Sequence, residues 1–470
     1  MAEKAREDRV IVVGSGIAGT AAAFRLRQAG CDVTLFEKEG HVGGRMSTRE
    51  VPVGDVRYRV DRGASWLSRN YAPMIRLLED AGLATRMLPC SDELGVLRDG
   101  RVHRLSLVQA SGLLRTGLLG WRAKFKALNL LRDLAAARRR LRWEDMSGAA
   151  GIDGESAREH ALRRLDRELL DYLIEPLCGT QFLVPAEEVA AVGAFCIMWG
   201  TFGAASFTFD GGVGSLPEHL LDTPVMRAPG TRVELGAHVT EVRRDGDGDG
   251  DGDGDGAGVA VVWERDGEVR TERARACVVA VPAPVAARIV TTLDDDQRRY
   301  LDGVRYTSDV HVTFGLRRPP AETALGVAVP RREHPDLCVA LYEHNLGPGR
   351  APAGRGLVTL IFRHDWNAAR MALDDDTVIA DARAALGEVM PDLAAHIDDH
   401  REMAVVQRWE NAVLARPAGG YRDLAAFTAS LDPASPVQLA GDHFAYSTTN
   451  AALATGERAA RRILDLPLAT

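Results

Sequence analysis

The sequence predicts an α/β fold built on a parallel β-sheet, and three segments near the N-terminus carry that prediction. Arg9–Val13 is a short, mainly apolar run, and residues 33–36 form a second one. Short apolar runs bounded by turns are typical of parallel strands that are buried on both faces. Between them, residues 17–29 are expected to form a helix that ends at Gly30. Together the three segments predict a β-α-β unit.

The composition is that of a globular enzyme with two or three structural units: 470 residues, 46% hydrophobic and 26% charged. A net charge of -8 argues against a nucleic-acid-binding protein, which is usually basic. We find neither a secretory signal nor a long apolar span, so we expect a cytoplasmic protein. The cysteines lack the spacing of metal ligands, so no metal site is expected and the thiols should be reduced and mostly buried. They are Cys31, Cys90, Cys178, Cys196, Cys277 and Cys338.

The turn after the first strand has the pattern G-x-G-x-x-G, formed by Gly14, Ser15, Gly16, Ile17, Ala18 and Gly19. Gly14 permits a tight turn, Gly16 leaves room for a diphosphate to approach the backbone, and Gly19 lets the helix pack close to the strand. The helix N-terminus then offers free N–H groups and a positive dipole to the phosphates. Because the pattern lies between a strand and a helix, it predicts a dinucleotide site.

Glu37 ends the second strand, where an acid is expected to accept hydrogen bonds from ribose hydroxyls, with Lys38 beside it. A carboxylate here repels a 2′-phosphate, which disfavours NADP. Gly43, Gly44 and Arg45 follow at a distance that lets the chain pass back under the diphosphate. The glycines allow close approach, and Arg45 supplies positive charge. The first motif fits NAD and FAD alike, and this second motif favours FAD.

Residues 10–46, VIVVGSGIAGTAAAFRLRQAGCDVTLFEKEGHVGGRM, resemble the N-terminal signature of the flavin-containing amine oxidoreductase superfamily. That family includes monoamine and polyamine oxidases, L-amino-acid oxidases, protoporphyrinogen oxidases and carotenoid desaturases. The resemblance continues in residues 61–66 (DRGASW), 211–216 (GGVGSL), 239–242 and 279–282, and in the C-terminal stretch LAGDHFAYSTTNAALATGERAARRIL.

The resemblance implies a noncovalently bound FAD and a Rossmann-like FAD-binding domain of the glutathione-reductase type, interleaved with an α+β substrate domain. The implied order is an FAD-binding segment 8–70, a helical substrate or cap region 71–209, a second FAD-binding segment 210–295, a β-rich substrate domain 296–405 and a C-terminal FAD-binding segment 406–470. The further cofactor contacts that it implies are Gly63, Ala64, Ser65, Trp66, Val239, Pro282, Gly441, Asp442, Thr449, Asn450 and Ala451. Asp442 also suits a plain turn, since Asp favours such positions.

The sequence departs from the amine oxidases at the flavin ring. Many of those enzymes place a lysine on a strand beneath the ring, and here His311 lies nearest to that position. It could act as a base or be a structural histidine. Tyr421 stands where a monoamine oxidase has its flavin-linked cysteine, and Thr448 stands near a cage tyrosine, so neither the link nor the cage is expected. Trp409 resembles a family tryptophan that lies against the flavin ring. Alternatively, Trp409 simply packs in the core.

A basic segment, residues 101–142, carries eleven Lys or Arg and a single acid, Asp133. Within it, residues 121–142 are expected to form a helix, and five apolar side chains share one face: Trp121, Phe125, Leu128, Leu131 and Ala135. A basic amphipathic helix can make peripheral contact with an anionic membrane. The alternative, which we favour from the sequence, is an ordinary surface helix. Its basic face would be solvated and its apolar face would pack on the rest of the protein.

We therefore expect an FAD-dependent oxidoreductase that takes a hydride from a substrate carbon, forming C=N or C=C, and passes electrons to oxygen or another acceptor. An apolar cyclic or biosynthetic small molecule would suit a pocket under residues 71–209 and the strands within 304–362. Four aromatic residues are expected near it: Trp199, Phe202, Phe207 and Phe209. The alternatives are an amine oxidase, a porphyrinogen oxidase or polyene desaturase on a membrane surface, and a noncatalytic scaffold stabilised by FAD. The oligomeric state stays open.

Overall fold

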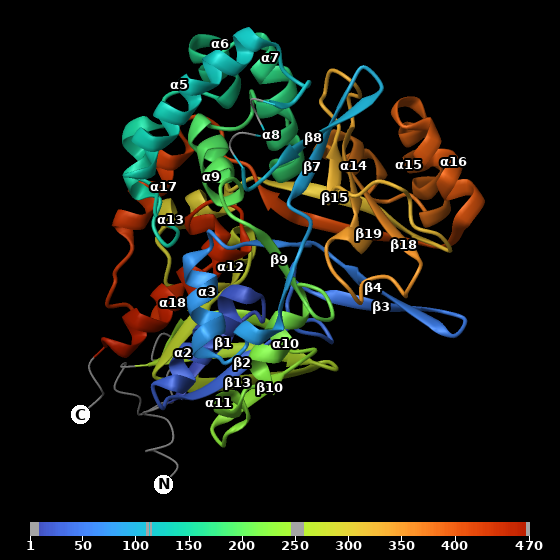
Figure 1. The fold of residues 1–470 in the computed structure, drawn as a ribbon. Helices are drawn as coiled ribbons and strands as arrows, with labels where there is room; N and C mark the ends of the chain where they lie inside the picture. The colour runs from blue at the N-terminus through green and yellow to red at the C-terminus, as the bar shows by residue number, and fades with distance from the viewer. Residues whose placement is uncertain (1–8, 110–111, 113–114, 246–257, 467–470) are drawn as a thin grey trace.

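The computed structural model describes residues 9–109, 112, 115–245 and 258–466. Figure 1 shows a parallel sheet with its helices in the lower left, a large sheet on the right and a group of helices at the top. Segments from the beginning, middle and end of the chain build the lower part, so the two ends of the chain share one unit.

The lower part is a five-stranded sheet in the order β10-β2-β1-β14-β20, with every neighbouring pair parallel. Val10 and Val12 face helix α2 (Ile17–Gln28), whereas Ile11 and Val13 face the opposite side. Burial on both faces explains why the strands are continuous apolar runs. The predicted β-α-β unit is confirmed. The strands are β1 (Arg9–Val13), β2 (Asp32–Phe36), β10 (Thr231–Glu234), β14 (Ala276–Val279) and β20 (Val437–Leu439).

Helices cover one face of this sheet and a small antiparallel sheet covers the other. The first face carries α2, α3 (Ala72–Asp80), α10 (Ser215–Leu221), α11 (Pro224–Arg227) and α18 (Thr449–Leu464). The second face carries β11 (His238–Arg244), β12 (Val259–Arg265) and β13 (Glu268–Ala274), with α12 (Ala283–Ile289), α13 (Asp295–Asp302) and α17 (Gly420–Ser430) beside them.

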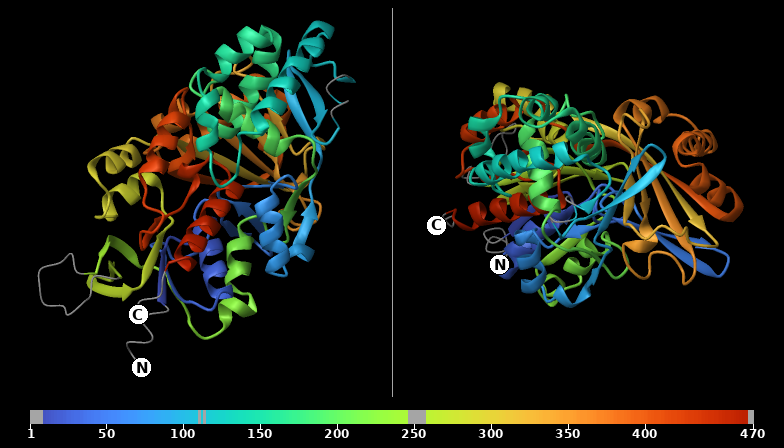
Figure 2. Two further views of the ribbon diagram at one scale, coloured as in Figure 1. Left: turned by 90° about the vertical axis from the view of Figure 1, so that its left-hand side faces the viewer. Right: turned by 45° about the horizontal axis from the view of Figure 1, so that its top comes forward.

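The large sheet has seven strands in the order β19-β15-β18-β17-β16-β7-β8. Val310, Val312 and Phe314 face the helices α14, α15 and α16, which lie on the outer side of the sheet in the right-hand view of Figure 2. Because strand residues alternate, Asp309 and His311 face the other way, toward the rest of the molecule. The elements are β7 (Glu93–Arg98), β8 (Arg101–Ser106), β15 (Tyr306–Leu316), β16 (Gly326–Ala328), β17 (Leu337–Tyr342), β18 (Gly356–Phe362), β19 (Arg401–Leu414), α14 (His364–Arg370), α15 (Asp375–Val389) and α16 (Pro391–His400).

The region 71–209 is less uniformly helical than expected. It holds the upper helices, but β7 and β8 belong to the large sheet. β7 pairs with β16 and β8 pairs with β7, which buries residues such as Val96 and Leu97. The upper helices are α5 (Trp121–Arg138), η2 (Ser147–Ile152), α6 (Ala157–Arg164), α7 (Arg167–Leu169), η3 (Leu170–Ile174), α8 (Glu175–Phe182) and α9 (Ala191–Thr201).

Small elements connect these parts. β3 pairs with β4 as a hairpin, and β9 lies between β5 and β6 in a three-stranded sheet. Their bounds are β3 (Thr48–Val53), β4 (Val56–Asp61), β5 (Leu67–Ser68), β6 (Met87–Pro89) and β9 (Ser206–Phe209), with short helices η1 (Ala84–Arg86), η4 (Glu343–Asn345) and η5 (Asp442–Phe444). Across the described ranges, no helix combines the length and hydropathy needed to cross a bilayer.

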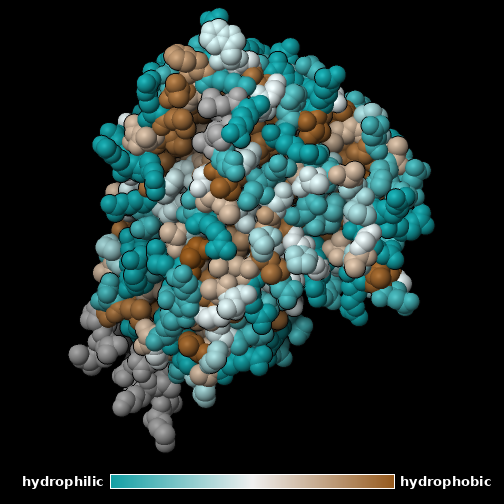
Figure 3. All heavy atoms as spheres, viewed as in Figure 1, coloured by the Kyte–Doolittle hydropathy of each residue, from teal (hydrophilic) through white to brown (hydrophobic). Residues whose placement is uncertain are grey.

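Helix α5 contradicts the favoured interpretation of its apolar face. It ends at Arg138 rather than at residue 142, and it buries the opposite side, through Ala123, Ala127, Leu130 and Ala137. The large side chains that were expected to pack on the protein are exposed: Trp121, Phe125, Leu128 and Leu131. Apolar residues gather over α5 in the upper left of Figure 3. The small alanines pack because they let α5 approach its neighbours closely, which turns the bulky residues outward.

Candidate cofactor and active site

Two glycines of the first turn are required by packing. Gly14 has a φ of 94°, and a Cβ there would lie 2.6 Å from the carbonyl oxygen of Ala280. A Cβ on Gly19 would lie 1.9 Å from the carbonyl oxygen of Gly14. Any side chain at either position would collide with backbone, so these glycines hold α2 close to the sheet.

Gly16 and Gly44 are less crowded, and a Cβ on Gly44 would be in ordinary contact with Gly16 Cα at 3.7 Å. The nearest atom to a Cβ on Gly16 would be the Gly43 carbonyl oxygen, 4.0 Å away, and Gly44 has a φ of 54°. Gly16 is also the N-cap of α2 and supplies no side chain to its first turn, which begins with the buried Ile17 and Ala18. Helix N-termini without caps present unpaired N–H groups and positive potential. The arrangement fits the diphosphate of a dinucleotide.

Glu37 lies beside this turn and is buried. Its Oε2 accepts hydrogen bonds from the Ser15 backbone N–H at 2.9 Å and from the Ser15 hydroxyl at 2.6 Å. Oε1 accepts the Glu39 backbone N–H at 3.0 Å. These bonds fix the carboxylate at the end of β2, where a ribose would lie. Lys38 is exposed and pairs with Glu39 at 3.5 Å, so its side chain points to solvent.

Two predicted residues from the middle of the chain lie near the same corner. Ala237 donates its backbone N–H to the Glu37 carbonyl oxygen at 2.8 Å, which brings the start of β11 and Val239 next to the acid. Pro282 follows β14 and is the N-cap of α12, two residues after Ala280, which touches Gly14. The middle segment therefore meets the glycine-rich turn from the side of β14.

The second glycine motif and the C-terminal motif meet through an ion pair. Arg45 donates from Nη1 to Asp442 Oδ2 at 2.8 Å, and Tyr306 donates its hydroxyl to Oδ1 at 2.9 Å. Burial would raise the pKa of the Asp442 carboxyl, but the Arg45 guanidinium and the hydrogen bonds lower it to about 2. Asp442 is thus ionised at neutral pH. Gly441 precedes it with a φ of 142°.

The predicted ring loop is fastened to Arg45. A Cβ on Gly63 would lie 2.3 Å from the Arg45 carbonyl oxygen, and Ala64 donates its backbone N–H to that oxygen at 3.1 Å. Ser65 Oγ lies 3.4 Å from Glu343 Oε1. Trp66 packs partly buried beside β7 and β17. The loop is therefore held between the second glycine motif and the large sheet.

Behind the loop lies a buried charge cluster that the sequence did not reveal. Arg350 is 1% exposed and contacts both Asp61 Oδ2 and Glu343 Oε2 at 2.5 Å. It also donates to the Ser65 carbonyl oxygen. Burial raises the pKa of Glu343, against the opposing effect of Arg350. The cluster fixes the backbone of the loop. Asp61 begins the DRGASW segment, but no local motif marks Glu343 or Arg350, and only the fold brings the three together.

His311 lies on the inward face of β15 and has an acidic partner. Its Nδ1 is 2.7 Å from Asp309 Oδ2, and the imidazole is 3% exposed. Burial lowers the pKa of His311, but the Asp309 charge and hydrogen bond outweigh it, so the pKa is raised. In the described part of the chain, Asp309 is its one hydrogen-bond partner, which leaves Nε2 available. The two-residue spacing on a strand was the signal for Asp309 that sequence reasoning missed.

Trp409 joins this strand to the ring loop. It is the register partner of Asp309 on β19, and its Nε1 donates to the Arg62 carbonyl oxygen at 2.5 Å. Arg62 precedes Gly63, so His311, Asp309 and Trp409 lie on the strands that flank the loop. Trp409 is half-buried rather than part of the core.

The last helix adds the third side of the site. Thr448 caps α18 by accepting the Ala451 N–H at 3.1 Å, so this donor is already bound. Asn450 Oδ1 accepts the Met74 N–H at 3.0 Å, while its buried Nδ2 has no partner among the described residues. Thr449 is the first residue of the helix. A Cβ on Gly456 would lie 2.1 Å from the Ala18 carbonyl oxygen, which shows how closely α18 approaches α2.

The four predicted aromatic residues have two different surroundings. Phe207 and Phe209 are fully buried in the core next to the parallel sheet. Trp199 stacks on Trp143 with ring centroids 4.2 Å apart, and Trp143 packs in turn on Tyr446, three residues before Thr449. An aromatic wall therefore runs from the upper helices to the C-terminal motif, with Phe202 partly buried beside it.

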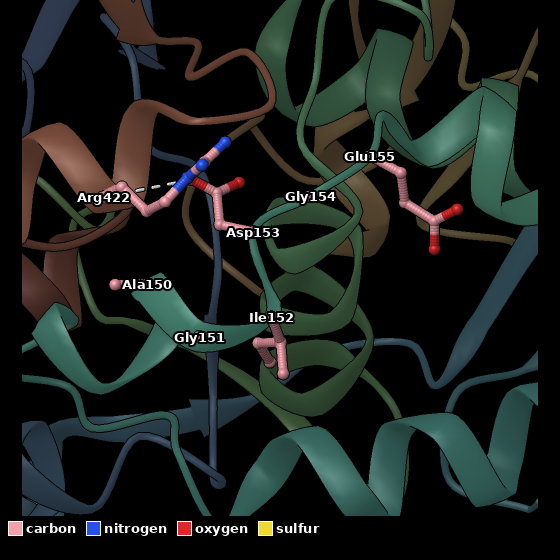
Figure 4. Close-up of a pocket in the computed structure, with 7 residues that line it drawn as sticks. All are labelled: Ala150, Gly151, Ile152, Asp153, Gly154, Glu155 and Arg422. Carbon is pink, nitrogen blue, oxygen red and sulfur yellow. Dashed lines mark hydrogen bonds between the residues drawn. The ribbon is translucent and has the colours of Figure 1, made fainter.

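A surface hollow of about 440 Å³ lies elsewhere, between η2 and α17 (Figure 4). Asp153 points from it toward the start of α17, where Oδ2 accepts the Tyr421 N–H at 2.6 Å and the Arg422 N–H at 3.3 Å. These bonds explain the buried carboxylate as a cap of α17. In the described ranges, no three His, Cys, Asp or Glu side chains gather as metal ligands would.

Comparison with known proteins identifies the fold. A model of the family described as flavin containing amine oxidoreductase matches residues 17–464. The chain belongs to this family. A protoporphyrinogen oxidase of Arabidopsis thaliana is 28% identical over 192 residues, which is 41% of this chain and 36% of that protein. The chain therefore aligns with little more than a third of the length of this curated relative.

Solved structures of two amine oxidases share the fold over 97% of this chain. Cyclohexylamine oxidase from Brevibacterium oxydans has a TM-score of 0.70 and 20% identity, covering 97% of this chain and 98% of that one. Putrescine oxidase bound to putrescine has a TM-score of 0.71 and 18% identity, covering 97% and 99%. The resemblance and the fold class expected from the sequence are confirmed.

The cofactor of this flavin containing amine oxidoreductase family member is FAD, and the residues present fit it. The uncapped end of α2 and the uncrowded backbone at Gly16 and Gly44 suit a diphosphate. The carboxylate of Glu37 suits a ribose, and the unpaired Nδ2 of Asn450 is a buried donor at the C-terminal motif. Tyr421 is buried at the start of α17, where its backbone N–H binds Asp153.

Proposed function

We propose that this protein is an FAD-dependent oxidoreductase that oxidises a substrate C–H bond to C=N or C=C. When bound, FAD would supply the hydride acceptor, a base would take the proton that the substrate also loses, and the electrons would go on to oxygen or another acceptor. The observation that carries the proposal is that three motifs distant in sequence meet: Gly43 bonds to Ser15 in the first turn, and Arg45 pairs with Asp442 of the C-terminal motif at 2.8 Å.

The chain supplies positioning and one candidate proton acceptor. We propose that His311, oriented by Asp309 at 2.7 Å, receives the substrate proton at Nε2, and that Trp409 walls the ring side of the site. The Asp309 charge raises the pKa of His311 and holds its Nδ1 side, which leaves Nε2 as the nitrogen that can exchange a proton. We also propose that the cofactor-binding residues expected from the sequence contact FAD. The five-segment domain order expected from the sequence is part of the same proposal. The Asp309 pairing favours the catalytic interpretation of His311 over a purely structural one.

The substrate we propose is an apolar, cyclic or biosynthetic small molecule. The aromatic wall of Trp143, Trp199 and Tyr446 supports this, because flat aromatic surfaces favour apolar ligands. The relatives include protoporphyrinogen oxidase, polyamine oxidase and phytoene desaturase, so an amine substrate is the second candidate. For the setting, we propose the cytoplasm with peripheral membrane contact through residues 101–142.

An anaerobic reduction screen tests the function. Holoenzyme is mixed with amines, amino acids, porphyrinogens and saturated cyclic metabolites, and the visible flavin absorbance is followed. We expect bleaching by an apolar cyclic compound, slowed by at least a hundredfold in His311→Gln. Rapid bleaching by amines alone would move the assignment to an amine oxidase. No bleaching by any class would favour a noncatalytic, FAD-stabilised protein.

A further inference from the structure

Helix α5 carries a strip of large apolar side chains that face solvent. Trp121 is 82% exposed, Phe125 71%, Leu131 55% and Leu128 46%. Successive residues on a helix are rotated by 100°, which places these side chains on one side of α5. Exposed contiguous apolar surface of this kind marks a site of interaction. We call this strip, together with Arg132 and Arg139 in line with it, the outer face of α5.

The orientation of α5 is fixed by bonds on its other side. Lys126 donates from Nζ to the Leu165 carbonyl oxygen at 2.8 Å, and Asn129 donates to the Arg164 carbonyl oxygen at 3.2 Å. Asp133 forms an ion pair with Arg164 at 2.7 Å. These contacts tie α5 to the neighbouring helix α6. The exposure of the outer face is therefore a property of the packed helix.

The charge around the outer face selects the kind of partner. Residues 121–142, which comprise α5 and the residues directly after it, carry eight basic residues and one acid, a local charge of +7, in a chain whose net charge is -8. Asp133 is already paired, and Glu168 next to the start of α5 pairs with Arg98 at 2.6 Å. The exposed Arg132 and Arg139 lie on the strip itself. A partner must therefore offer negative charge and an apolar layer together.

We infer that the outer face of α5 docks on an anionic lipid surface. Such a helix lies flat at the interface, with its apolar side chains among the acyl chains and its arginines at the headgroup phosphates. An 18-residue helix gives a contact line of about 27 Å. A second copy would bring two faces of positive charge together, and a nucleic acid would leave the apolar strip unpaired. This inference stands apart from the proposed redox activity.

Vesicle binding by the holoprotein tests the inference. The holoprotein is sedimented with vesicles of phosphatidylcholine, with or without phosphatidylglycerol, at low and high salt. We expect binding only to the anionic vesicles and weakening with salt, because exposed charges are screened. The Trp121 emission should shift to the blue on binding, and Trp121→Phe should remove most of that shift.

Matched variants separate the docking face from general effects. Phe125→Glu/Leu128→Glu should reduce vesicle binding at least tenfold, while Val269→Glu, at a site 68% exposed on β13, should leave it unchanged. Arg132→Gln/Arg139→Gln should weaken binding about fivefold per residue. Arg57→Gln/Arg227→Gln removes the same charge elsewhere and is the control, since both side chains are exposed. Flavin content and melting temperature verify that each variant is folded.

Loss of binding in the α5 variants and not in the controls supports the inference, whether or not the vesicles alter turnover. Equal pelleting of all variants, or no pelleting at low salt, overturns it. A dimer in lipid-free solution that dissociates in Phe125→Glu/Leu128→Glu also overturns it, because the face would then be a contact between copies.

Discussion

Gly16→Ala should separate the cofactor cradle from the fold. A methyl group at Gly16 has the Gly43 carbonyl oxygen as its nearest neighbour, 4.0 Å away, so the chain without FAD can accept it. The same methyl group would fill space beside the end of α2 that we assign to the diphosphate. Gly19→Ala is the contrast, because its Cβ would lie 1.9 Å from the Gly14 carbonyl oxygen. Gly40→Ala is the matched control, with no atom within 4 Å.

The expected magnitudes follow from these distances. Gly16→Ala should change the free energy of unfolding of the apoprotein by less than about 1 kcal/mol, which is the cost of a poorer N-cap. Its affinity for FAD should fall at least tenfold, a loss of about 1.4 kcal/mol or more. Gly19→Ala should destabilise the apoprotein by about 1–3 kcal/mol or more, since α2 must move away from the turn. Gly40→Ala should change neither quantity.

The assay combines FAD titration of the apoprotein, followed by flavin fluorescence, with urea denaturation without cofactor. The reasoning fails if Gly16→Ala binds FAD as tightly as wild type, because a diphosphate could not then lie against that backbone. It also fails if Gly16→Ala and Gly19→Ala lose the same apoprotein stability, because the two glycines would share one structural role.

Three further changes test the charges of the site. Arg45→Met should lower the free energy of unfolding near neutral pH by about 2–3 kcal/mol or more, because it leaves the buried Asp442 carboxylate without its ion-pair partner. A depressed carboxyl pKa contributes stability above about pH 4 that disappears as the pH falls toward 2, so urea midpoints of wild type and variant should converge there. Asp309→Asn should lower the pKa of His311, which an imidazole proton titration by NMR would show. Because the pKa of His311 is raised in the folded protein, protonated His311 contributes stability that is fully present below pH 6.5 and is lost as the pH rises through the folded pKa. The free energy of unfolding of Asp309→Asn should therefore lack this decrease with rising pH. His311→Gln should slow substrate-dependent flavin reduction by about 10²–10⁴ at unchanged FAD content, and a change below tenfold would remove the base assignment.

The parts of the fold that the sequence predicted well are those where local rules and tertiary structure agree. The turn from Gly14 to Gly19 needs glycine for backbone reasons that any β-α-β unit shares, so its context was sufficient. The apolar runs of β1 and β2 reflect burial on both faces, which leaves a direct mark in the sequence. The C-terminal motif was placed by resemblance, because residues so distant in sequence give no local sign that they meet.

The parts that were missed depend on which surface meets which. The face of α5 with Trp121 and Phe125 has a regular apolar spacing, but spacing cannot show whether a face meets protein or solvent. The small residues of the other side, such as Ala123 and Ala127, decided the packing. Likewise, Arg350 pairs with Asp61 although the two residues lie far apart in the sequence, and only the assembled fold brings them together.

The cofactor site itself is tested most directly by the flavin content of the purified protein. Denaturation of the yellow protein should release an equimolar amount of intact FAD, with no flavin left attached to the chain. A colourless protein that stays colourless after incubation with FAD would contradict the account, as would a bound nicotinamide dinucleotide in its place.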